Sequence, residues 1–186
     1  AIEKSISEGI NEFDTADCYG LGMSETRLGK IIKSYNREKV RINTKFGVRI
    51  DNSGTRCVDN SIEWMSSAID QSLKRLNTDY IDLYLLHSWD KKTDLNIIFC
   101  KLEELRRDGK ILKYGVSNLI NLEDVIYNRY NINSFSLEFS YVCHENNMYI
   151  NNYLKNNIRF MPYGVLAQGL LSGKYKTNDF KTNDRR

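Results

Sequence analysis

The order of two kinds of segment is the feature that most constrains the fold of this chain. Short runs rich in β-branched and aromatic residues alternate with longer segments whose apolar residues recur at helical spacing. This alternation predicts parallel strands joined by right-handed helical crossovers, in either an open doubly wound sheet or a closed barrel. The strands are expected over residues 10–16, 39–46, 80–87, 114–118, 134–141 and 158–166.

The segments between these runs carry helical signals. Ser24 is a suitable N-cap residue for the first of them. Gly109 stands where the C-terminus of the third favours a left-handed residue. The last segment is rich in asparagine and has the weakest pattern. Helices are expected over residues 24–35, 60–76, from about 95 to 108, 122–130 and 147–156.

Composition excludes several classes of partner. The 186 residues include 27 Lys+Arg and 24 Asp+Glu, and the basic residues form no runs. Neither nucleic acid nor an anionic membrane surface is therefore expected as a partner. No apolar stretch reaches the roughly 18 residues of a membrane helix, and the first residues lack a signal-peptide pattern. We expect a cytoplasmic protein in which residues 1–186 form one domain.

The four cysteines argue against a metal centre. Cys18, Cys57, Cys100 and Cys143 are widely separated, without a CxxC pair, which fits neither a disulfide framework nor a zinc site. Reduced thiols and no bound metal are expected. Cys18 is interpreted as a small buried thiol, although its position leaves a place near a site open.

Polar residues collect at the ends of the expected strands. Asp14, Lys45, His87 and the pair Ser117–Asn118 each lie near the C-terminal end of a different strand. In a closed barrel those ends converge on one mouth, where barrel enzymes keep their chemistry. Four strands that each contribute a polar group favour a barrel over a sheet with a single switch point.

Several motifs, in this order, resemble those of the aldo-keto reductases. Any one of them is weak evidence, but their order and spacing together are specific, and they span nearly the whole chain. The motifs are FDTADCYG (13–20) with Ser24-Glu25 and Leu28-Gly29, TKFG (44–47), SLKRL (72–76) leading to DYIDLYLLH (79–87), Gly109-Lys110, GVSN (115–118) and LAQGLLSGKY (166–175).

The resemblance implies a (β/α)8 barrel that reduces an aldehyde or ketone with NADPH. Protonating the developing alkoxide needs an acid, and a tyrosine with a pKa near 10 needs electrostatic help at neutral pH. In this interpretation Tyr19 is the acid, Lys45 lowers its pKa, and Asp14 keeps the lysine charged. His87 hydrogen-bonds and orients the carbonyl oxygen. The cofactor supplies the hydride.

The resemblance also assigns residues to the cofactor. Ser117 and Asn118 match the pair that binds the nicotinamide carboxamide, and Tyr163 matches the aromatic residue that stacks on the ring. Ser136 stands where the family usually has Gln, and Gly164 stands where Ser is common. The chain has no GxGxxG motif after a strand, which tells against a Rossmann dehydrogenase. The loop after Tyr163, over residues 166–174, is expected to approach the pyrophosphate of the cofactor through Leu166, Gln168, Gly169 and Lys174.

Alternatives remain open at this point. Trp89 either lines the substrate pocket or covers the barrel rim, and each polar residue taken alone has a structural explanation. Complete barrels have about 250 residues, so the first and last strands of such a barrel are expected to lie outside these 186 residues. Besides an active reductase, the chain could be a cofactor-sensing regulatory protein or a truncated, non-catalytic one. The sequence leaves the substrate and the oligomeric state undetermined.

Overall fold

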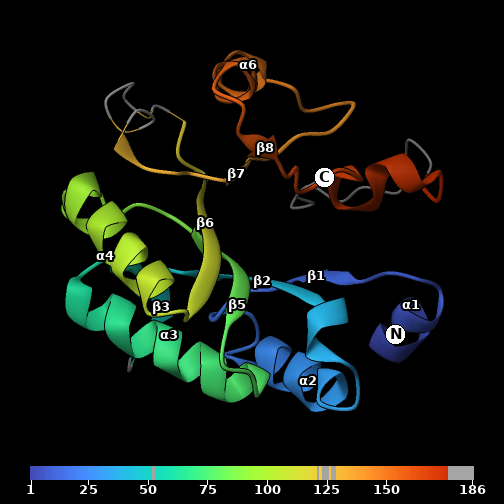
Figure 1. The fold of residues 1–186 in the computed structure, drawn as a ribbon. Helices are drawn as coiled ribbons and strands as arrows, with labels where there is room; N and C mark the ends of the chain where they lie inside the picture. Colours follow the sequence, from blue (N-terminus) through green and yellow to red (C-terminus); the bar gives the residue numbers. More distant parts are fainter. Residues whose placement is uncertain (52, 121, 123–125, 127–128, 176–186) are drawn as a thin grey trace.

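A curved parallel sheet forms the centre of the structure (Figure 1). This computed structural model describes every residue except 52, 121, 123–125, 127–128 and 176–186. The sheet strands within that part are β1 (Glu12–Asp14), β2 (Arg41–Phe46), β5 (Ile81–Leu86), β6 (Ile111–Ser117), β7 (Ser134–Ser136) and β8 (Arg159–Phe160). They pair in the order β1-β2-β5-β6-β7-β8, and each pair is parallel. The predicted incomplete (β/α)8 barrel is confirmed.

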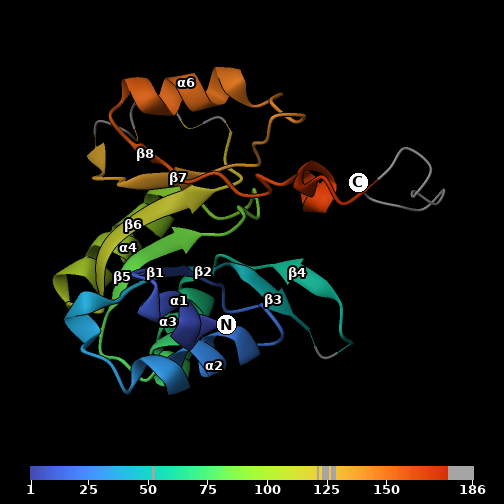
Figure 2. The same cartoon turned by 90° about the vertical axis from the view of Figure 1, so that its right-hand side faces the viewer.

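Helices connect successive strands and cover the outside of the sheet (Figures 1 and 2). The described helices are α1 (Ile2–Ser7), α2 (Met23–Ile32), α3 (Ile62–Leu76), α4 (Leu95–Arg107) and α6 (Asn147–Lys155), with short 3₁₀ helices η1 (Arg37–Lys39) and η2 (Ala167–Ser172). Helix α3 contacts β2, α4 contacts β6, and α6 contacts β8. None of these described helices is long and apolar enough to cross a bilayer.

Strand periodicity divides the side chains between two environments. Thr44, Tyr84 and Tyr114 are register neighbours on β2, β5 and β6, and all three are fully buried on the helix side of the sheet. Phe46 and Tyr84 stack with ring centroids 4.7 Å apart, and Tyr114 packs on Phe99 of α4. Because successive side chains alternate between faces, the residues one position further along each strand point into the barrel.

The barrel interior is crowded at β6. Lys45, Leu85 and Gly115 are register neighbours on the inner face. A Cβ atom on Gly115 would lie 2.1 Å from the carbonyl oxygen of Ser134, so only glycine allows β7 to pair this closely. The two edge strands of the sheet are linked by Glu12 of β1, whose carboxylate pairs with Arg41 and with Arg159 of β8.

Several predicted boundaries were wrong. The first two strands and β5 lose one or two residues at their ends, β7 and β8 are much shorter than 134–141 and 158–166, and β6 begins earlier, at Ile111. Helix α2 is capped by Gly22, with φ 85°, and Ser24 lies inside the helix. A side chain at position 22 would collide with Arg75. The expected helix 122–130 lies largely outside the described residues.

A hairpin was not anticipated from the sequence. Strands β3 (Val48–Ile50) and β4 (Arg56–Val58) pair antiparallel between β2 and α3. The sequence gives no signal for these strands, because each is only three residues long and too short to show a period-2 pattern. The predicted left-handed residue after α4 is confirmed, since Gly109 has φ 75°. Ser61, which was not predicted as a cap, accepts a hydrogen bond from the Trp64 N–H at the start of α3.

A buried carboxylate joins β2, α2 and α3. Glu25 is fully buried and accepts hydrogen bonds from Thr44 Oγ1 at 2.6 Å and from Arg75 Nε at 2.7 Å. Nearby, Thr15 donates a hydrogen bond to Ser24 at 2.7 Å. These contacts fix the loop between β1 and α2, which carries residues 15–22.

Removing this carboxylate should be costly. Glu25→Ala leaves the Arg75 guanidinium without its partner at a partly buried position, so we expect a loss of about 3–5 kcal/mol in the free energy of unfolding. Urea denaturation measures this loss. Glu104→Ala is the matched control because Glu104 pairs with Lys101 at the surface, and its unfolding midpoint should barely move. Equal effects of the two variants would contradict the importance of the buried contact.

Candidate active site

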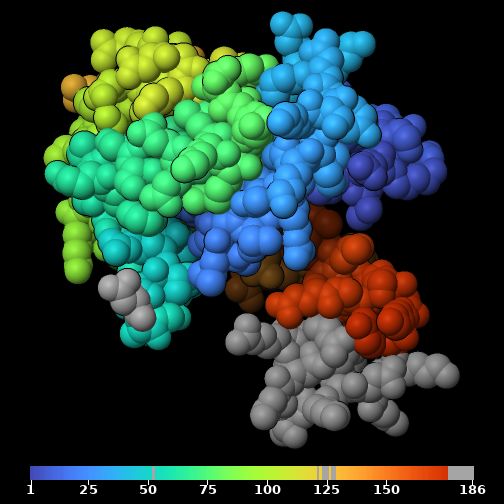
Figure 3. All heavy atoms as spheres, turned by 90° about the horizontal axis from the view of Figure 1, so that it is seen from below, coloured from blue at the N-terminus to red at the C-terminus, as the bar shows by residue number. Residues whose placement is uncertain are grey.

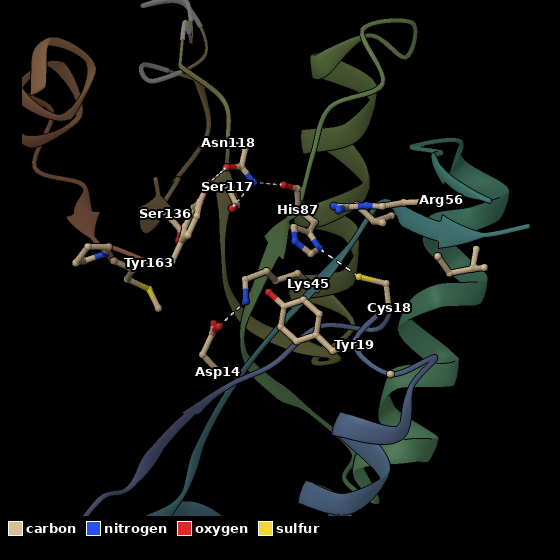
Figure 4. Close-up of a pocket in the computed structure, with 15 residues that line it drawn as sticks. Asp14, Cys18, Tyr19, Lys45, Arg56, His87, Ser117, Asn118, Ser136 and Tyr163 are labelled. Atoms are coloured by element: carbon tan, nitrogen blue, oxygen red, sulfur yellow. Dashed lines mark hydrogen bonds and ion pairs between the residues drawn. The ribbon is translucent and has the colours of Figure 1, made fainter. Parts of the chain in front are cut away.

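A cavity of about 610 Å³ opens at the C-terminal ends of the strands (Figure 4). Side chains from β1, β2, β6 and β7 and from the loops after β1, β5, β6 and β8 converge on it, as the barrel prediction required. The space-filling view shows the surface hollowed between the N-terminal elements and the segment that includes η2 (Figure 3). The cavity is lined by Asp14, Cys18, Tyr19, Gly20, Lys45, Val48, Ile50, Arg56, His87, Ser117, Asn118, Ser136, Met161, Pro162 and Tyr163.

Lys45 is held at the floor of this cavity. Its residue exposure is 5%, and a buried ammonium needs compensating partners. Lys45 Nζ donates to Asp14 Oδ2 at 2.5 Å and to the carbonyl oxygen of Thr15 at 2.8 Å. Asp14 remains about half exposed. The predicted Lys45–Asp14 pair is thus present, and both charges face the cavity.

Tyr19 lies beside this pair, and 42% of its surface is exposed. Lys45 Nζ is 5.4 Å from the centroid of the Tyr19 ring, and Figure 4 shows the hydroxyl directed toward the ammonium. The expected lowering of the tyrosine pKa is wrong for this arrangement. Burial raises the pKa of Tyr19 above 10.0, and the charge of Asp14 raises it further. The reason is geometric, since Asp14 is already paired with the lysine and its negative charge opposes that of the ammonium.

His87 directly follows β5 and lies beside the tyrosine. The two rings meet edge to face with centroids 5.8 Å apart. Burial lowers the pKa of His87 to about 4, assisted by the positive charges of Lys45 and Arg56. Its Nδ1 lies 3.7 Å from Cys18 Sγ. The imidazole is therefore neutral at pH 7, and its second nitrogen is available to the cavity.

Ser117, Asn118, Ser136 and Tyr163 lie together on the opposite wall (Figure 4). Asn118 Nδ2 donates to the carbonyl oxygen of His87 at 3.0 Å, and the Tyr163 hydroxyl donates to Asn118 Oδ1 at 2.6 Å. The backbone of Asn118, with φ 58°, donates to the Ser136 carbonyl. These polar groups satisfy one another, which keeps the Asn118 amide turned into the cavity.

Other predicted site residues lie outside the lining. Trp89 does not contribute to the cavity wall, because its ring packs on the hydrophobic core and its indole N–H donates to the Thr93 carbonyl. Gly164 packs against Glu138, and η2 carries Gln168 and Gly169 with positive φ. Leu166, Gln168, Gly169 and Lys174 follow the cavity along the chain, and their predicted role remains a prediction.

Several lining residues were missed. Cys18 was interpreted as an ordinary buried thiol, whereas it is partly exposed and faces His87. Val48, Ile50 and Arg56 come from the unexpected hairpin, and Met161 and Pro162 follow β8. The only sequence signal for Cys18 was its position between Asp14 and Tyr19. The hairpin residues carried none.

Asp17 is a buried carboxylate without a hydrogen-bond partner among the described residues. Burial raises its pKa to about 7, and the negative charge of Glu25 adds to the effect. The backbone of Cys18 offsets part of this rise without satisfying the oxygens. Donor atoms of Asp17, Cys18 and His87 lie within 4.8 Å of one another, a donor number suited to zinc. We assign no ion to the cluster, and the metal-free interpretation stays a prediction.

Comparison with known proteins shows the family to which the chain belongs. The sequence matches the model of the aldo/keto reductase family over residues 1–186, and the chain belongs to that family. Probable aldo-keto reductase 1 of Glycine max is 31% identical over 186 residues, covering 98% of this chain and 53% of the relative. Aldo-keto reductase yakc [NADP(+)] of Schizosaccharomyces pombe is 31% identical over 196 residues. The match covers 96% of this chain and 55% of that relative.

A solved structure agrees with the fold. The aldo-keto reductase AKR11C1 from Bacillus halodurans, in its holo form, superposes with a TM-score of 0.88 at 30% identity, covering 95% of this chain and 60% of that one. The chain thus spans about half the length of the curated relatives it matches.

Asp17 should make stability depend on pH. Its folded pKa is about 7, whereas an unfolded aspartate titrates near 4, so the fold binds a proton that the unfolded chain releases. The resulting stabilisation is present below pH 4 and is lost by about 1.4 kcal/mol per unit as pH rises to about 7. Asp17→Asn should therefore raise stability by roughly 2–4 kcal/mol at pH 8 and little at pH 4.5. Denaturation at both pH values checks this, and a pH-independent effect would contradict it.

His87 should stay neutral well below its usual range. Its Cε1 proton resonance, followed by NMR, should keep its neutral position from pH 8 to about pH 5. The chain has only one other histidine, so a His144→Gln variant assigns the signals. A midpoint near 6.5 would show that the buried environment has been misjudged.

Proposed function

We propose that this chain carries the catalytic half-site of an NADPH-dependent oxidoreductase that reduces an aldehyde or ketone to the alcohol. The supporting observation is that Asp14 and Lys45, from two strands, and Tyr19 and His87, from two loops, share one cavity. A weak acid, a fixed cation and a neutral hydrogen-bond donor around one space are the groups that carbonyl reduction requires. Family membership supports the same reaction class.

Tyr19 is the proton donor in this mechanism. Its raised pKa keeps it protonated at pH 7, so the proton is available when negative charge develops on the carbonyl oxygen. At that moment the buried Lys45 ammonium stabilises the forming phenolate, because charges interact strongly in a poorly solvated site. Asp14 and the Thr15 carbonyl hold the ammonium in position. The electrostatic help thus acts as the proton leaves, rather than by lowering the resting pKa.

His87 orients the carbonyl in this proposal. Burial and the charge of Asp17 raise the pKa of Cys18, which keeps it a thiol. With the thiol as the donor to His87 Nδ1, 3.7 Å away, the ring proton of this proposal resides on Nε2. A neutral imidazole with Nε2–H donates a hydrogen bond to the carbonyl oxygen without competing with Tyr19 as an acid.

The described residues fit the nicotinamide end of the cofactor. Ser117, the Asn118 amide and Ser136 offer hydrogen bonds to a carboxamide, and Tyr163, 42% exposed, offers an aromatic face. Bound NADPH supplies the hydride. Gly164, Leu166, Gln168, Gly169 and Lys174 are proposed to contact its phosphate-bearing part. Ser136 is too short to reach as far as glutamine, so Ser117 and Asn118 bear most of the orientation.

Removing the tyrosine hydroxyl tests the assignment. Tyr19→Phe should lower kcat for carbonyl reduction by at least about a hundredfold while leaving NADPH affinity, measured by cofactor fluorescence, nearly intact. Tyr141→Phe is the control because Tyr141 is 89% exposed and does not line the cavity. Tight NADPH binding with no turnover in the unmutated protein would favour a cofactor-sensing role. Weakened binding with unchanged kcat would contradict the role of Tyr19.

A further inference from the structure

We propose that Arg56 forms an anion-binding subsite that selects carbonyl substrates bearing a carboxylate. The proposal rests on the proposed function and adds the substrate class. Arg56 lies at the start of β4 and lines the cavity beside Val48 and Ile50. Figure 4 shows its side chain extending from the hairpin toward His87. In this proposal the Arg56 guanidinium faces the substrate, whereas Lys45 is held at the strand ends.

The pairing of the hairpin decides which arginine enters the cavity. Ile50 pairs with Arg56, and Arg49 pairs with Cys57. Paired residues share a face of a two-stranded sheet, so Ile50 and Arg56 face the cavity together. Arg49 instead pairs with Asp59 at 2.9 Å and lies over the Trp64 ring. The two arginines of one hairpin therefore have different roles.

The charge of Arg56 is uncompensated. Within the described part of the chain no carboxylate pairs with it, whereas the other cation of the cavity, Lys45, is bound to Asp14. With His87 neutral, the cavity retains one net positive charge.

The chemistry of the guanidinium favours a carboxylate. Its planar donors bind the two oxygens of a carboxylate together. Val48 and Ile50 beside it suit a short apolar spacer. The substrate class is thus an aldehyde or ketone whose carbonyl lies between Tyr19 and His87 and whose carboxylate, a few carbons away, reaches Arg56.

Matched substrates test this proposal. In the protein with NADPH, kcat/KM for 4-oxobutanoate should exceed that for its neutral methyl ester by about tenfold or more. Arg56→Gln should abolish the difference by lowering kcat/KM for the acid alone, and Arg56→Lys should restore part of it. Arg49→Gln is the control, because it removes the same charge from the other face of the hairpin. An equal preference in the unmutated protein and Arg56→Gln would overturn the proposal.

A binding measurement separates this proposal from the proposed function. Butanoate and butanamide are titrated against the unmutated protein and Arg56→Gln by NMR. Tighter binding of butanoate that disappears in Arg56→Gln supports the subsite even if no carbonyl is reduced, in which case only the proposed function fails. Equal binding of both ligands overturns the subsite. An Arg56→Gln variant with weaker NADPH binding and unchanged acid preference also overturns it, since Arg56 would then contact the cofactor.

Discussion

The burial of one ammonium group determines much of this molecule. Lys45 is only 5% exposed, and leaving its charge unpaired there would cost several kcal/mol. Its partners, Asp14 and the Thr15 carbonyl, both belong to the end of β1 and the loop after it. The ammonium therefore ties the first two strands together at the point where the chain turns toward Tyr19. The same contact that stabilises the strand pair holds the ammonium 5.4 Å from the centre of the Tyr19 ring.

A second set of contacts supports that loop from behind. Glu25, Thr44 and Arg75 connect three elements beneath residues 15–22. The cost is visible at Asp17, whose carboxylate is buried close to Glu25 without a hydrogen bond. Burial disfavours the charged form of a carboxyl group that lacks hydrogen bonds, which is why the pKa of Asp17 is raised. The loop that carries Tyr19 is thus supported by the Glu25 contacts, while the Asp17 carboxyl group in the same loop is buried without a hydrogen bond.

Sequence reasoning predicted the parts that repeat and missed the parts that do not. The strand ends carrying Asp14, Lys45, His87 and Ser117 follow from β/α alternation, because parallel strands must converge at one mouth. Short elements such as β8 and the hairpin have too few residues to show a period. The resting pKa of Tyr19 and the contact of Cys18 with His87 depend on distances between segments that are far apart in sequence. No local pattern records such distances.

The hairpin has one further consequence. Its two strands pair only with each other, and the six-stranded sheet is complete without them. An element attached in this way can change in length and sequence while the β/α framework, and the tyrosine and lysine it supports, keep their positions. In evolutionary terms, the cavity wall formed by Val48, Ile50 and Arg56 is separable from the β/α framework that carries Asp14 and Lys45. Changes in about ten residues after β2 can therefore reshape that wall without moving the strand ends.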